Sequence, residues 1–140
     1  MMSLVDINLV AVLVAAVVGF GIGMLWYSPL LFSKMWMSLS GLTAKDMGKA
    51  KKKGMMQSMV LGFLSLLVMN YVLAHLVDYM QAKTAMEGMQ AGFWLWLGFI
   101  ATVMLGSVLW ENKSWKLYLL NVAHYLVVLL ASGAILAVWA

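Results

Sequence analysis

The chain has 140 residues, of which 65% are hydrophobic and 10% are charged, with a net charge of +4. A soluble domain of this size needs more polar side chains to cover its surface, so this composition excludes one. One proline and no cysteine also exclude collagen, a disulfide scaffold and thiolate metal sites. The composition therefore predicts an integral membrane protein.

Four apolar stretches are each long enough to cross a hydrocarbon core, which requires about 20 helical residues. They are apolar on every face, whereas membrane β-strands alternate, and in lipid the backbone of such a segment must bond within itself. We therefore predict one domain, residues 1–140: an all-α integral membrane protein with four transmembrane helices in an up-down bundle. The predicted spans cover about residues 4–26, 55–77, 89–110 and 117–139.

The connection over residues 30–54 is predicted to hold a short interfacial helix. It follows Pro29, which ends the first span because the residue before a proline is displaced from the helical region. The apolar residues from Leu30 to Leu39 are too few to cross the membrane, so a helix lying in the headgroup layer suits them.

Lysine distribution predicts the orientation. The connections after the first and third spans hold eight lysines, whereas the connection after the second span holds only Lys83. The lysine-rich sides are therefore expected in the cytoplasm and both termini outside. No nucleic acid is expected, since the basic residues cluster beside a span; the alternatives for the cluster are anionic lipid headgroups or a docking protein. The predicted headgroup contacts are Lys45, Lys49, Lys51, Lys52 and Lys53.

Small residues at helical spacing mark two seams. Small side chains let helices approach closely, so both seams are predicted to pack helices, within the chain or between two copies. Since four helices leave a large outward surface, we expect a homo-oligomer; a narrow permeation path is the alternative reading of the seams. The seam residues are Ala11, Ala15, Gly19 and Gly23 in the first span and Gly98, Thr102 and Gly106 in the third.

Polar side chains at membrane depth are costly and often functional. Asn121 and His124 share a helix face, and at 1.5 Å per residue His124 lies roughly 10 Å from the cytoplasmic end of its span. Together with Asn70 they form a predicted polar path for a proton or solute, with hydrogen bonding between helices as the alternative.

A second polar group is expected near the outer boundary. It consists of Asp6, His75 and Asp78, which we interpret as an outer vestibule. A hydrogen-bonded boundary pair, a proton-sensing or cation-attracting vestibule and a metal site are the readings left open. The two histidines differ in depth by about 20 Å, so one shared site is excluded, and no metal or cofactor is predicted.

Several strings of residues are distinctive. They are Leu25-Trp26-Tyr27-Ser28-Pro29, Gly41-Leu42-Thr43, the run from Gly92 to Gly98, and Leu109-Trp110-Glu111-Asn112. In these strings the chain resembles a family of small bacterial integral membrane proteins, catalogued as domain of unknown function number seventeen sixty-one. The resemblance covers nearly the whole chain. It implies a stand-alone domain in the bacterial inner membrane and carries over no catalytic residues.

The polar path and the small-residue seams favour a small homo-oligomeric channel or transporter for an ion or small solute. The alternative is a non-transporting structural or accessory subunit that binds anionic lipid or a partner protein, which the scarcity of charge within the spans favours. A hydrolase is disfavoured: Ser132 shares a helix face with His124, but no carboxylate within reach completes a triad.

Overall fold

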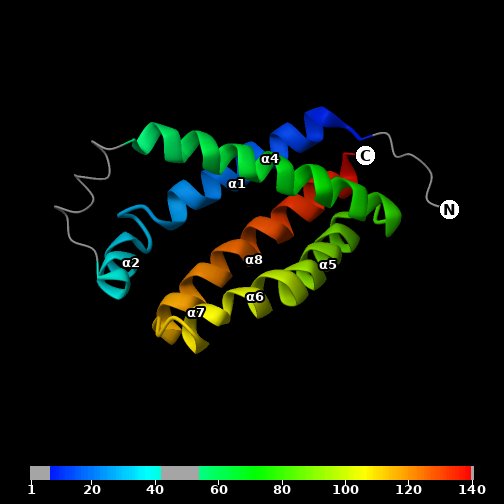
Figure 1. The fold of residues 1–140 in the computed structure, drawn as a ribbon. Helices are drawn as coiled ribbons and strands as arrows, with labels where there is room; N and C mark the ends of the chain where they lie inside the picture. The colour runs from blue at the N-terminus through cyan, green and yellow to red at the C-terminus, as the bar shows by residue number, and fades with distance from the viewer. Residues whose placement is uncertain (1–6, 42–53, 140) are drawn as a thin grey trace.

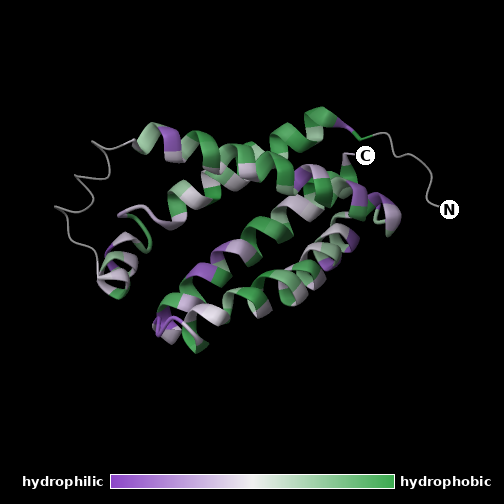
Figure 2. Cartoon of the chain, in the orientation of Figure 1, coloured by the Kyte–Doolittle hydropathy of each residue, from purple (hydrophilic) through white to green (hydrophobic). Residues whose placement is uncertain are grey.

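The computed structural model describes residues 7–41 and 54–139, and within these ranges the regular structure is helical (Figure 1). Four helices are long and apolar enough to cross a membrane, which confirms the predicted all-α class. They are α1 (Leu9–Trp26), α4 (Met55–Tyr79), the span Ala85–Leu109 and α8 (Trp115–Val138). Figure 2 shows hydrophobic colour along much of each long helix and hydrophilic colour at the turn before α8.

Some of the sequence predictions lie outside the described residues. These are the predictions for Asp6 and for Lys45, Lys49, Lys51, Lys52 and Lys53. The short helix expected after the first span is present as α2 (Ser33–Ser40), which ends at Gly41 in the left-handed conformation.

A polar side chain caps the start of α1. Asn8 precedes α1 and accepts hydrogen bonds from the backbone N–H groups of Val10 and Ala11. Its Nδ2 donates to the carbonyl of Trp139 at 2.9 Å, so the start of α1 is tied to the end of α8. We name this end of the bundle, where α1 begins and α8 ends, the terminal end.

The third span is not one regular helix, unlike the unbroken stretch that the sequence predicts. It is built from α5 (Ala85–Leu95), a π-helical segment η1 (Trp96–Ala101), α6 (Thr102–Met104) and α7 (Gly106–Leu109). Two bonds from side chains tie this region to α8: Trp96 Nε1 donates to the Val122 carbonyl at 2.7 Å, and the Tyr118 hydroxyl donates to the Ala101 carbonyl at 2.6 Å. These contacts between helices are a physical reason for the departure from a regular helix.

Helix α8 is the centre of the bundle. It contacts α1, α4 and α5, and it is the most buried of the four spans (Figure 1). Its contact with α5 depends on glycine, because a Cβ at Gly88 would overlap the Gly133 carbonyl and a Cβ at Gly92 would overlap the Leu129 carbonyl. The two backbones therefore touch directly, as in other small-residue crossings in membranes.

We expect Gly88→Ala and Gly92→Ala to force α5 away from α8 and to lower the free energy of unfolding by about 1–3 kcal/mol. Unfolding in mixed detergent measures this. Gly98→Ala, in the same span, is the matched control, because a Cβ there meets nothing within 4 Å. A Gly92→Ala variant as stable as the wild type would contradict the close crossing.

Candidate functional site

Helices α1, α4 and α8 meet along one line, which we name the three-helix seam. Each helix contributes a residue at every fourth position, so the stripes run nearly along the helix axes. The seam residues are Ala11, Ala15, Gly19 and Gly23 of α1, Leu66, Asn70 and Ala74 of α4, and His124, Val128, Ser132 and Leu136 of α8. They form successive layers across the bundle.

The middle layer of the seam is apolar. A Cβ added at Gly19 would lie 3.3 Å from Val128 Cγ1 and 3.5 Å from Leu66 Cδ2, so these three residues meet at one level. Val128 is fully buried. We name Gly19, Leu66 and Val128 the apolar plug, since together they fill the seam at this level.

One turn from the plug, away from the terminal end, lies His124. A Cβ at Gly23 would lie 3.2 Å from His124 Nε2, which places the imidazole directly against α1. Aromatic rings surround it: the ring centroids of Tyr125, Tyr27 and Trp26 lie 4.8, 5.2 and 6.1 Å from that of His124. The side chain is about nine-tenths buried, and in the described part of the chain neither ring nitrogen has a hydrogen-bond partner.

The end of the seam beyond His124 is closed by hydrogen bonds from α1 to α8. The Tyr27 hydroxyl donates to Asn121 Oδ1 at 2.7 Å, and Trp26 Nε1 donates to the Leu120 carbonyl at 3.2 Å. Burial, with Tyr125 as a lesser cause, raises the pKa of Tyr27 to about 12. Tyr27 is therefore a neutral donor at physiological pH.

On the other side of the plug, one turn towards the terminal end, a second polar layer holds Asn70 and Ser132. Asn70 follows Leu66 by four residues and Ser132 follows Val128 by four, so both lie near the level of Ala15. Asn70 Nδ2 donates to the Leu66 carbonyl at 2.9 Å. Both side chains are almost fully buried, and among the described residues Asn70 Oδ1 and Ser132 Oγ have no partner.

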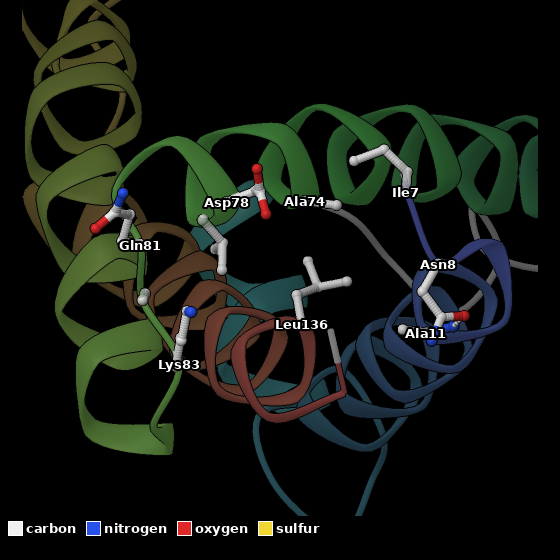
Figure 3. A pocket seen from close by; sticks show the side chains of 10 residues that line it. Ile7, Asn8, Ala11, Ala74, Asp78, Gln81, Lys83 and Leu136 are labelled. Atoms are coloured by element: carbon white, nitrogen blue, oxygen red, sulfur yellow. Dashed lines mark hydrogen bonds between the residues drawn. The ribbon is translucent and has the colours of Figure 1, made fainter. Parts of the chain in front are cut away.

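The seam opens at the terminal end into a cavity of about 270 Å³ (Figure 3). Its apolar lining includes Ala11, Ala74 and Leu136, which lie one turn beyond the layer of Asn70 and Ser132. Charged and amide side chains line it as well, including Asp78 and Lys83.

Of the three residues of the predicted polar path, His124 and Asn70 lie on the seam and Asn121 lies at its end beyond His124. Asn121 and His124 lie on one side of the apolar plug and Asn70 on the other. Asn121 is bonded to Tyr27, whereas His124 and Asn70 each keep a polar atom without a partner in the described chain.

The predicted outer vestibule is only partly assembled within the described residues. Asp78 lines the cavity at the terminal end. His75 does not line it; its Nδ1 lies 2.9 Å from the Tyr71 carbonyl, and its ring packs edge-on against that of Tyr71. The described residues hold no group of three His, Cys, Asp or Glu that could bind a metal ion.

The predicted small-residue seams have different environments. The four residues of the first span face α4 and α8 of the same chain along the three-helix seam. In the third span, Gly98 and Thr102 are exposed, and Thr102 Oγ1 donates to the Gly98 carbonyl at 2.6 Å. A Cβ at Gly106 would contact only its neighbour Trp110 within 4 Å.

Several site residues were not identified as such from the sequence. Ser132 was considered only as a nucleophile, although its spacing of eight residues from His124 indicates the same helix face. Lys83 and Gln81 entered no predicted site, because they follow a span and only the folded turn brings them back over its end.

The fold and the seam define a class: a helical bundle with four helices long and apolar enough to span a membrane, and with buried polar layers between three of them. Residues 10–137 match the family described as protein of unknown function DUF1761. The chain belongs to this family, which confirms the resemblance noted from its sequence. No curated protein and no solved structure matches the chain.

We expect Tyr27→Phe to lower the free energy of unfolding by about 1 kcal/mol near neutral pH, because Asn121 Oδ1 loses its donor. The folded tyrosine keeps its proton to a higher pH than the unfolded one. The contribution of the Tyr27 hydroxyl to the free energy of unfolding is therefore complete below pH 10 and is lost as the pH rises towards about 12. Unfolding of wild type and variant between pH 8 and pH ~12 should show the difference shrinking over that range.

The exposed Tyr71 provides the control for this measurement. Tyr71→Phe should leave the unfolding free energy near the wild-type value at neutral pH. A Tyr27→Phe variant that behaves like Tyr71→Phe would show that the bond to Asn121 contributes nothing.

Proposed function

We propose that this protein is a small membrane transporter for an ion or small solute, with the three-helix seam as its path. The observation that carries the proposal is the set of buried polar atoms on the seam that have no partner in the described chain: both ring nitrogens of His124, Asn70 Oδ1 and Ser132 Oγ. Leaving such an atom unpaired costs about 1–3 kcal/mol, so side chains kept only for packing would be apolar or fully bonded.

The layer order supports a carrier that opens and closes rather than a permanent pore. The apolar plug separates the layer of His124 from the layer of Asn70 and Ser132. A solute in either layer would find hydrogen-bonding groups, but passage between them requires the plug to part. Gly19 contributes no side chain, so the barrier consists of Val128 and Leu66.

His124 is the group best suited to handle a proton on this path. A neutral imidazole has one ring nitrogen that accepts a proton and one that donates it, and buried ionisable groups in membrane spans commonly mark proton or substrate routes. The neighbouring Tyr27 and Asn121 provide a hydroxyl and an amide at the end of the seam. In this proposal His124 gates the step between that end and the plug.

The membrane context is part of the proposal. Both termini lie outside a bacterial inner membrane, and the lysine-rich connection contacts anionic headgroups in the cytoplasm. A homo-oligomer would form through outward faces such as the exposed stripe of Gly98 and Thr102, because the small residues of α1 are occupied within the chain.

We expect His124→Gln to reduce flux in proteoliposomes by at least about tenfold, equivalent to about 1.4 kcal/mol. The measurement uses an internal pH dye for protons and labelled ions or small neutral and zwitterionic solutes. His75→Gln is the matched control, since His75 lies off the seam. Equal flux in both variants would contradict the role of His124; no flux of any species in the wild type would favour the accessory-subunit alternative.

We expect Val128→Ala to raise the passive leak of protons or small solutes through the protein, because it thins the apolar plug at its most buried residue. Val127→Ala is the control: its side chain is 39% exposed on the adjacent position of the same helix. Leak is measured in proteoliposomes as the rate at which an imposed gradient of protons or of a small solute decays. A folded Val128→Ala protein with the leak of Val127→Ala would show that the plug is not the barrier.

A further inference from the structure

The cavity at the terminal end is lined by both apolar and polar side chains (Figure 3). Its base is made of small apolar side chains from all three helices of the seam. Its rim carries one acidic group, one basic group and two amides: Asp78, Lys83, Gln81 and Asn8. A volume of about 270 Å³ suits a solute of few heavy atoms, since sites for larger ligands begin near this size.

The two charges on the rim are opposite and separate. Asp78 lies in the last turn of α4, and Lys83 lies in the turn between α4 and α5. Figure 3 draws Asp78 and Lys83 with no dashed line between them. Lys83 has a second acidic neighbour, because its backbone N–H donates to the Glu87 carboxylate at 3.3 Å. A ligand carboxylate at Lys83 would share that ammonium group with Glu87, whereas a ligand ammonium group would face Asp78.

Gln81 occupies a backbone position that favours glycine. Its φ is 57°, a left-handed conformation that glycine adopts most readily. This conformation ends α4: the Gln81 N–H donates to the Asp78 carbonyl at 2.9 Å, and the Ala82 N–H donates to the Val77 carbonyl at 3.0 Å. Glycine would make the same turn with less strain, so the turn itself does not require the glutamine side chain.

Asn8 fixes the opposite wall of the cavity. Its Oδ1 accepts from the first turn of α1, and its Nδ2 donates to the Trp139 carbonyl. Because these bonds occupy the amide, Asn8 holds the wall in position, and recognition falls to the other three polar side chains.

We propose that this cavity binds a small zwitterionic solute, with its ammonium group facing Asp78, its carboxylate facing Lys83, and the Gln81 amide bonding to one of them. The inference rests on the proposed function, because the bound solute is the one that the seam transports. The cavity base lies one turn from Asn70 and Ser132, so a solute released inward meets polar groups next.

Binding is tested on the full chain in detergent with three probes: L-alanine, which carries both charges, and ethylammonium and propionate, which each carry one. Isothermal titration should show L-alanine binding at least about tenfold more tightly than either half. If ethylammonium or propionate binds as tightly as L-alanine, the cavity is a site for a single charge and the proposal of a zwitterionic ligand is wrong. Absence of binding by all three probes would overturn the proposal.

Asp78→Asn and Lys83→Gln should each weaken L-alanine binding about tenfold or more, because each removes a charge-assisted contact. Lys113→Gln, at the opposite end of the bundle, is the charge-matched control and should bind like the wild type. The unfolding midpoint without ligand shows that each variant is folded. Unchanged affinity in folded Asp78→Asn and Lys83→Gln would overturn the assignment of the rim.

Gln81→Gly separates a binding role from a structural one. It should raise the unfolding midpoint, because the strained conformation is relieved, and at the same time weaken L-alanine binding. A more stable variant with wild-type affinity would remove Gln81 from the site.

The His124→Gln protein distinguishes this proposal from the proposed function. It should bind L-alanine in detergent with wild-type affinity although its flux is lost. Binding that is retained in a wild-type protein without flux would support the cavity and contradict transport. Flux that persists in a protein that binds none of the probes would support transport and contradict the cavity.

Discussion

The architecture depends on the direct approach of two helix backbones, made possible by glycine at the crossing of α5 and α8. Without water in the surrounding lipid, the attraction between spans comes from close packing and from bonds such as that of Trp96 to the Val122 carbonyl. With one side of α8 fixed in this way, the adjacent side, about 100° round the helix, is presented to α1 and α4. The seam on that side then receives its layers from residues four apart on α8, beginning with His124.

Two requirements conflict within the seam: tight packing and the presence of buried polar groups. Packing in a membrane favours small and apolar side chains, which Gly19 and Val128 supply. The buried polar atoms of His124, Asn70 and Ser132 lower stability unless something compensates for them. They lie on both sides of one apolar layer, so the seam has two polar layers and one barrier between them, and the proposed transport rests on this order.

Much of the fold follows from the sequence, because twenty or so apolar residues in lipid have few alternatives to a helix. The polar residues Asn121 and His124 were recognised by depth alone. Depth does not show which helices pack against each other, because the small residues of α1 could pack against a second copy of the chain as well as against α8. In the third span the sequence offers the spacing of Gly98, Thr102 and Gly106, and periodicity alone does not show that Gly88 and Gly92 are the glycines that face α8. Helical periodicity does not predict the cavity at the terminal end, because Lys83 reaches the cavity that Asp78 lines only through the turn that follows α4.

The π-helical segment divides the third span into two mechanical parts. The half before Trp96 is clamped by glycine contacts, whereas the Tyr118 hydroxyl holds Ala101, the last residue of the π-helical segment. A rigid span matches a thinner or thicker bilayer only by leaning as a whole. A span with a widened turn at its middle bends there instead, so its far half follows the thickness of the lipid while the clamped half stays in register with α8.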